Sequence, residues 1–137
     1  MSDLKEFSSH YVNELGGPNN QDAWHSLVEA DDAIIPFLVE AYRSEADPKR
    51  RSLLVNVIWE HRVPESLEFL AEALGDPVDE VWKSALDGIV AIGGPIASGV
   101  LESARHRIET DNKGYAERIE WIDEGIQQIR DERQGSR

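Results

Sequence analysis

A pattern of apolar residues that recurs about every 32 residues constrains the fold of this chain more than any other feature. Residues 64–95 contain two amphipathic segments, each with apolar side chains three and four positions apart, as on one face of an α-helix. A Gly-Asp-Pro stretch separates the two segments, and a Gly-Gly-Pro stretch follows the second. Such stretches end helices, so this unit is predicted to be a helical hairpin. We expect Gly75 to take the left-handed conformation that ends the first helix.

The neighbouring segments repeat this hairpin. At an offset of 32, the first helix has four matches, which pair Phe37, Leu38, Glu40 and Ala41 with Phe69, Leu70, Glu72 and Ala73. At the same offset, the second helix has four more, which pair Ser52, Leu54, Val57 and Ile58 with Ser84, Leu86, Ile89 and Val90. A fixed period in this range is typical of stacked helical arrays. We therefore predict an all-α protein, an α-solenoid of about three to four helical hairpins with seven to eight helices.

The chain is short enough to form one domain, residues 1–137. We expect residues 1–31 to be N-terminal capping helices and residues 32–63, 64–95 and 96–131 to be the repeats. The last helix is expected from about residue 113 to 133, whereas the polar residues 105–112 show no helical pattern. Lys49, Arg50 and Arg51 lie in the first turn of a helix, where the helix dipole disfavours cations, so we expect them to pair with acids of an adjacent repeat.

The chain is strongly acidic, with 27 acidic and 14 basic residues and a net charge of −13. A field of this sign repels phosphate backbones, so nucleic acid is not an expected partner, whereas association with basic proteins is favoured. An acidic surface that only keeps the protein in solution is the alternative. No stretch has the length of a membrane span, and the N-terminal residues lack the apolar run of a signal peptide. We therefore expect a cytoplasmic protein with no membrane contact.

The stretch Leu-Ala-Glu-Ala-Leu-Gly-Asp-Pro from Leu70, followed by Ser-Ala-Leu-Asp-Gly-Ile-Val-Ala-Ile-Gly-Gly-Pro from Ser84, resembles the short HEAT-like repeats of the bilin-lyase type. The resemblance covers roughly residues 32–104. It implies a right-handed α-solenoid in which the first helices form the convex side and the second helices the concave side. The family usually has basic positions after Asp-Pro-x-Val, whereas Glu80 and Asp87 add negative charge here.

The sequence offers little that suggests catalysis or metal binding. The four histidines are dispersed without ligand spacing, and the chain has no cysteine. HEAT-like deoxyhypusine hydroxylases bind iron through His-Glu pairs, but the one adjacent pair here, Glu60-His61, has the reverse order. Because His61 falls on the apolar side of its helix, a core histidine is favoured over a metal ligand. No nucleotide-binding or serine-hydrolase motif is present, so we expect no enzymatic activity, no catalytic or metal-binding residue and no cofactor.

The tryptophans suggest where a partner would bind. Trp24 and Trp82 fall on apolar stripes and are predicted to be in the core. Trp59 lies at the margin of its apolar arc and Trp121 about 100° or more from its stripe, and both are beside acidic residues. A tryptophan ringed by acids has the composition of an interface anchor, and packing between repeats is the alternative. The predicted contact residues are Asn56, Trp59, Glu60, Asp87 and Trp121. The predicted steering charges are Glu80, Glu117 and Glu124.

These observations favour a non-enzymatic module that presents an acidic concave surface to a basic protein partner. Small acidic HEAT-like proteins resemble, among others, immunity proteins that neutralise toxic nucleases, which would be one instance of this function. The alternative is a bilin-lyase-like protein that holds a tetrapyrrole or another cofactor in the concave groove. Self-association through the terminal repeats is a third possibility, and we expect a monomer or a weak dimer.

Overall fold

The computed structural model describes residues 2–111 and 115–135, and these residues form helices and turns without any strand. The prediction of an all-α protein is therefore confirmed for the described residues. The short 3₁₀ helices η1 (Asp32–Ile34) and η2 (Pro64–Ser66) precede α3 and α5. The α-helices are α1 (Ser2–Glu14), α2 (Asn20–Glu29), α3 (Ile35–Ser44), α4 (Pro48–Glu60), α5 (Leu67–Ala73), α6 (Asp79–Ile92), α7 (Gly94–Asp111) and α8 (Ala116–Gly135).

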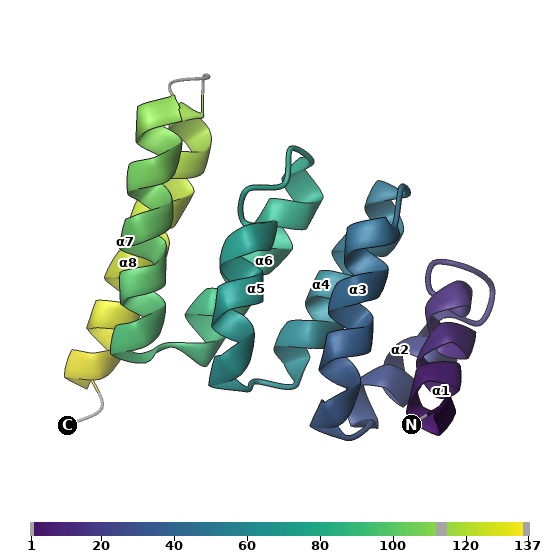
Figure 1. The fold of residues 1–137 in the computed structure, drawn as a ribbon. Helices are drawn as coiled ribbons and strands as arrows, with labels where there is room; N and C mark the ends of the chain where they lie inside the picture. The colour runs from purple at the N-terminus through teal and green to yellow at the C-terminus, as the bar shows by residue number, and fades with distance from the viewer. Residues whose placement is uncertain (1, 112–114, 136–137) are drawn as a thin grey trace.

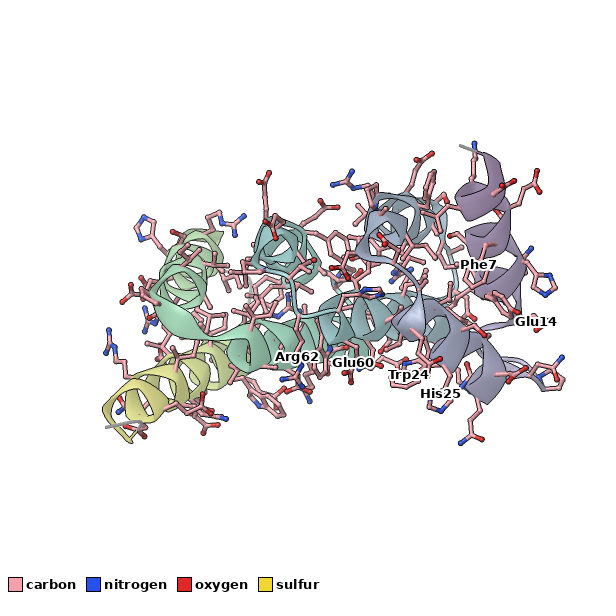
Figure 2. All side chains as sticks on the ribbon, turned by 90° about the horizontal axis from the view of Figure 1, so that it is seen from below. Phe7, Glu14, Trp24, His25, Glu60 and Arg62 are labelled. Atoms are coloured by element: carbon pink, nitrogen blue, oxygen red, sulfur yellow. The ribbon has the colours of Figure 1, made fainter. Side chains whose placement is uncertain are left out.

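Consecutive helices form pairs, and the pairs stand in a row from α1 and α2 to α7 and α8 (Figure 1). Seen at right angles to that view, the helices lie in two layers (Figure 2). The first-helix layer consists of α1, α3, α5 and α7, and the second-helix layer consists of α2, α4, α6 and α8. Helix α4 packs against α2 and α6, and α6 packs against α8, so the second-helix layer is continuous along the row.

The core lies between the two layers and is built from the apolar stripes of the helices. Trp82 is only 1% exposed, as its position on the stripe predicts. Trp24 is partly buried and packs against this core. The largest side chains that are fully buried with Trp82 are Leu15, Leu27, Ile34, Leu38, Leu54, Ile58, Leu70, Leu74, Ile89, Leu101 and Ile122.

Aspartates begin several of the helices. Asp31 accepts a hydrogen bond from the Ala33 N–H at 2.9 Å, and Asp47 accepts one from the Lys49 N–H at 3.2 Å. Asp76 does the same for the Val78 N–H at 2.9 Å, just before α6. Each carboxylate satisfies an amide that has no partner within the helix, and its negative charge lies at the positive end of the helix dipole.

Of the three basic residues in the first turn of α4, only Arg51 pairs with an acid of an adjacent hairpin, as predicted, and Lys49 makes no ion pair with another described residue. Arg51 donates to both carboxylate oxygens of Asp76, at 3.2 and 3.3 Å. Arg50 donates instead to the backbone carbonyl of Leu15, at 3.2 Å, where α1 has just ended. The unfavourable interaction with the dipole of α4 is therefore offset by contacts that tie α4 to the elements on either side of it.

One local prediction was wrong. Gly75 does not take a left-handed conformation, because α5 ends in tight right-handed turns with hydrogen bonds from Gly75 N–H to Glu72 O and from Asp76 N–H to Ala73 O. The positions with positive φ in this part of the chain are Arg62, with φ of 55°, Gly93, with φ of 66°, and Gly94, with φ of 88°. Residues 105–111, whose polar sequence shows no helical pattern, continue α7 as helix. The predicted start of the last helix, residue 113, lies outside the described residues.

Candidate functional site

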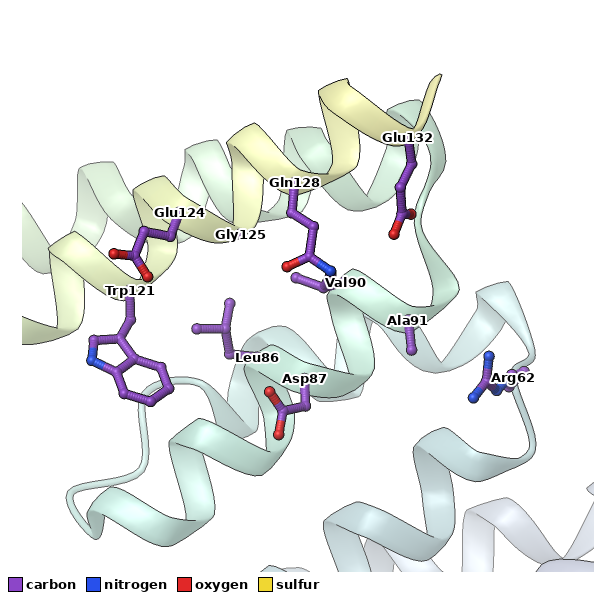
Figure 3. Close-up of a pocket in the computed structure, with 10 residues that line it drawn as sticks. All are labelled: Arg62, Leu86, Asp87, Val90, Ala91, Trp121, Glu124, Gly125, Gln128 and Glu132. Carbon is purple, nitrogen blue, oxygen red and sulfur yellow. The ribbon is translucent and has the colours of Figure 1, made fainter. Parts of the chain in front are cut away.

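A groove with a volume of about 410 Å³ runs between α6 and α8 in the second-helix layer (Figure 3). Its floor is apolar and its rims are polar, and Arg62 lies at one end. The residues that line it are Arg62, Leu86, Asp87, Val90, Ala91, Trp121, Glu124, Gly125, Gln128 and Glu132.

Close packing of the two helices makes the floor of this groove. A Cβ atom added to Gly125 would lie 3.1 Å from Val90 Cγ2 and 3.2 Å from Leu86 Cδ1, so the glycine lets α8 approach α6. Contacts this tight leave no room for a larger residue without rearrangement. The groove is therefore a shallow channel over a packed floor.

Trp121 forms the wall of the groove at the end opposite Arg62 (Figure 3). Its side chain is 38% exposed, and its ring packs edge-on against the buried Trp82, with the ring centroids 5.8 Å apart and the planes at 86°. Lys83 Nζ lies 4.5 Å from the centroid of the Trp121 ring. Because Trp82 is fixed in the core, the exposed ring of Trp121 is held in a defined orientation.

Three carboxylates face the groove, Asp87 from α6 and Glu124 and Glu132 from α8 (Figure 3). None of the three makes a hydrogen bond or an ion pair with another described residue. Some acids elsewhere in the described chain are paired, as for Glu72 with Arg43 at 2.6 Å and Asp123 with Arg105 at 2.7 Å. Partial burial raises the pKa of Asp87, because the charged form loses hydration that no basic group replaces.

Arg62 closes the other end of the groove. It follows the last turn of α4 in the left-handed conformation that is usually taken by glycine, and its N–H donates to Trp59 O at 2.9 Å. Its guanidinium carbon lies 5.6 Å from the centroid of the Trp59 ring. The one basic side chain that lines the groove is thus held at its margin, on the outer side of the second-helix layer (Figure 2).

No family model, curated protein or solved structure matches this chain. The chemistry of the groove is therefore the evidence on its function.

Of the eight residues predicted to contact a partner or to steer it, the structure brings Asp87, Trp121 and Glu124 together in this groove. Glu80 and Glu117 are exposed on the same two helices but do not line it. The remaining three residues, Asn56, Trp59 and Glu60, belong to α4.

Two of the α4 residues have packing roles. Asn56 Oδ1 accepts a hydrogen bond of 2.6 Å from Trp24 Nε1, which ties α4 to α2. Trp59 lies against Gly88 of α6, where an added Cβ would stand 2.5 Å from Trp59 Cβ and Cγ. Its indole Nε1 is buried and has no hydrogen-bond partner among the described residues. Packing between neighbouring hairpins, the alternative considered for this tryptophan, therefore fits Trp59 better than a role as an exposed anchor.

Sequence reasoning missed Arg62, Gln128 and Glu132 as groove residues. A signal for two of them was present, because Glu124, Gln128 and Glu132 follow one another at four-residue spacing and so share one face of α8. Arg62 had no such signal, since its side chain reaches the groove only through the turn after α4.

His61 is a structural residue of the interior, as the sequence suggests. Its side chain is 2% exposed, with Nδ1 2.7 Å from Asp32 Oδ1 and Nε2 3.0 Å from the Leu27 carbonyl oxygen. Both ring nitrogens are therefore engaged by the elements before α3. Within the described residues there is no group of three or more His, Asp or Glu side chains placed to hold a metal ion. Nor does any described helix combine the length and apolar composition of a membrane span.

A second groove of about 600 Å³ lies in the first-helix layer, between η1 with α3 and η2 with α5. Its lining is mostly apolar and includes Ile35, Val39, Val63 and Phe69. Asp32, Arg43 and Glu65 supply its charged groups. It lies on the opposite layer from the groove that contains Asp87 and Trp121.

Proposed function

We propose that this chain is a non-enzymatic protein-binding module whose groove between α6 and α8 receives a basic protein partner. One observation carries the proposal. Two helices that are far apart in the sequence bring a half-exposed tryptophan and three carboxylates without described partners to a single groove.

The chemistry of this groove suits a cation on a protein surface better than a small anion or a nucleic acid. Aromatic residues are enriched among the anchors of interfaces, and an indole held rigidly by Trp82 loses little conformational entropy on binding. The net charge of −13 attracts a basic partner from a distance and repels phosphate. The unpaired carboxylates then favour the docked orientation.

We further propose that the helical pairs form a right-handed α-solenoid of the HEAT-like type, with the second-helix layer as its concave side. The recurrence of the sequence pattern and the two layers of helices support this assignment. An immunity-type inhibitor of a toxic nuclease is one instance of the proposed function, because nucleases that bind phosphate backbones have basic surfaces.

Capture of a partner from a lysate of the native source tests the proposal. The wild-type chain is expected to retain a basic protein at low salt and to release it at high salt. Replacing Asp87 and Glu124 with lysine should abolish capture, whereas the same replacements at Glu80 and Glu117, which change the net charge equally, should weaken it much less. Capture of no basic protein, or equal losses with the two double variants, would contradict the proposal.

The cofactor-binding alternative has one observation in its favour, the apolar groove between α3 and α5. A groove of about 600 Å³ is of the size that small-molecule sites have. A tetrapyrrole would give the protein purified from its native source a visible absorption band. A band that is lost when Val39 is replaced with a bulky charged residue would favour this alternative over protein binding.

A further inference from the structure

We infer that the partner enters the groove between α6 and α8 as an amphipathic α-helix, with basic residues on one face about two turns apart. This inference rests on the proposed function and adds the secondary structure and charge spacing of the bound segment.

The spacing follows from the rim on α8. Glu124, Gln128 and Glu132 stand on successive turns of that helix, and the eight residues from Glu124 to Glu132 span roughly 12 Å along its axis. Asp87 stands on the opposite wall, between the positions of those two glutamates along the groove (Figure 3). A partner helix with cations seven or eight positions apart, and a third between them, would place one near each carboxylate.

The groove offers an extended chain few partners for its backbone. Every buried N–H and C=O group needs a hydrogen-bond partner, and an extended segment must find these partners outside itself. Apart from Arg62, Gln128 and the indole N–H of Trp121, the polar side chains of the lining are carboxylates, which repel the carbonyl oxygens of such a segment. A helix satisfies its own backbone and presents only side chains to the groove.

The floor also suits a helix. Leu86, Val90 and Gly125 form a low apolar strip between two packed helices, and Ala91 keeps the α6 rim low next to it. Helices pack into the groove between ridges of side chains at axial distances of about 8–10 Å. A third helix can reach this distance only where the residues beneath it are small or already packed flat, as they are here.

Charge complementarity identifies the basic character of this helix. The acids at the rim are unpaired among the described residues, whereas Glu102 is paired with Arg130 at 3.1 Å and Asp123 with Arg105 on other faces of α7 and α8. Arg62 lies at the end of the groove toward Glu132, beyond Ala91 (Figure 3). Cations of the partner are therefore confined to the part of the groove between Trp121 and Glu132.

Two synthetic peptides of about fifteen residues test the inference. Both are alanine-rich, end-capped and identical in composition, with three arginines. One carries the arginines at alternating four- and three-residue spacing on one face, and the other carries them at every fifth position, which spreads them around the helix. A third peptide carries the same three arginines in a proline-rich sequence that cannot form a helix. Binding of each to the full chain is measured by isothermal titration calorimetry at low salt.

We expect the one-face peptide to bind at least about tenfold more tightly than the other two peptides. The Asp87→Asn variant should weaken that binding by about fivefold or more, and the matched Glu80→Gln variant by less than about twofold, because Glu80 lies outside the groove. Circular dichroism and thermal unfolding of both variants confirm that each remains folded.

Equal affinity for the two helical peptides, or equal effects of the two variants, would show attraction by the overall charge and would overturn the inference. Equal or tighter binding of the proline-rich peptide would overturn the helical form. In either case the proposed binding of a basic protein stands or falls separately, by the capture experiment.

Discussion

Gly88 of α6 is the residue at which the packing of the second-helix layer leaves least room. Its missing side chain lets Trp59 of α4 lie directly on the backbone, and an added Cβ would stand 2.5 Å from two carbons of that side chain. We therefore expect Gly88→Ala to destabilise the fold by about 2 kcal/mol, because the clash outweighs the better helix propensity of alanine. Chemical denaturation measures the change.

A matched control is available in α7. Gly99 is also in the interior of a helix, but a Cβ added there meets nothing within 4 Å. Gly99→Ala should therefore stabilise the protein by up to about 1 kcal/mol. If Gly88→Ala also proved stabilising, the close contact between α4 and α6 would be wrong.

Asp76 joins three elements through one buried carboxylate. Burial by itself raises the pKa of this group, but hydrogen bonds from Tyr42, the Val78 N–H and Arg51 outweigh it and hold the pKa below its ordinary value. The ionised form is thus bound more tightly by the folded state. Its stabilisation is complete above the pKa of the unfolded chain and is lost as pH falls through the lower, folded pKa.

We expect Asp76→Asn to lower the free energy of unfolding at pH 7 by about 2–3 kcal/mol. The difference from wild type should shrink as pH falls into the range where the carboxylate is protonated. Asp123→Asn, which breaks the exposed pair with Arg105, should change stability by less than about 1 kcal/mol. Urea unfolding between pH 7 and pH 3 separates the two cases. If the Asp76→Asn variant were less stable than wild type by the same amount at every pH, the role of the ionised carboxylate would be contradicted.

The charge of Asp87 should affect the stability of the fold in the direction opposite to that of Asp76. Because partial burial raises its pKa, the folded state binds the proton more tightly than the unfolded chain does. The unfavourable effect of the charge is present above the folded pKa and is relieved as pH falls through it. Asp87→Asn should therefore stabilise the isolated protein slightly, by less than about 1 kcal/mol after solvent screening, and more at pH 7 than at pH 4. Destabilisation by this substitution at pH 7 would indicate an unrecognised partner for the carboxylate.

At the scale of the elements, the apolar period predicted which segments are helical but not how each helix ends. Helix α5 ends in right-handed backbone turns, in which the N–H groups of Leu74, Gly75 and Asp76 bond carbonyl oxygens three or four residues earlier. These turns end the helix without a left-handed Gly75. Residues 105–111 lacked an apolar stripe, yet they remain helical because Arg105 bonds both Glu109 on the next turn and Asp123 on α8. Such contacts depend on a neighbouring helix and cannot be read from a local pattern.

The groove was only partly predictable for the same reason. Trp121 was predicted because it lies off the apolar stripe of its helix, and Asp87 and Glu124 because they add negative charge. That they share one groove depends on Gly125, which sets the approach of α8 to α6. From the sequence, Asn56 and Trp59 resemble residues of an exposed binding surface. In the structure Asn56 is bonded to Trp24 of α2, and Trp59 packs on Gly88 of α6.

Arg62 offers a test of how α4 ends. A residue other than glycine in the left-handed conformation costs about 1 kcal/mol, and the contact with the Trp59 ring recovers only part of this in water. We expect Arg62→Gly to raise the midpoint of thermal unfolding, whereas Arg62→Ala should lower it, because alanine keeps the backbone cost and loses the contact with the ring. A lower midpoint for the glycine variant would mean that the contact of Arg62 with Trp59 contributes more than the backbone strain costs.

At the scale of the whole molecule, the net charge of −13 should affect stability and binding in opposite directions. Like charges repel one another in the compact state, so salt that screens them should stabilise the isolated protein. The same screening should weaken the attraction of a basic partner, over a distance of about 10 Å at 0.1 M salt. Raising sodium chloride from low to moderate concentration is therefore expected to raise the unfolding midpoint and to lower the affinity for the one-face peptide.

A comparison of two double variants separates the effect of the overall charge from specific recognition in the groove. Replacing Glu80 and Glu117 with glutamine, or Asp87 and Glu124 with asparagine and glutamine, removes two charges in either case. Both variants should reduce the stabilisation by salt to a similar extent, since repulsion depends on the whole field. Only the second should lose most of its peptide affinity, because only its carboxylates line the groove. If both variants lost affinity equally, the acidic surface would act through its overall field, and the groove would contribute no specific recognition.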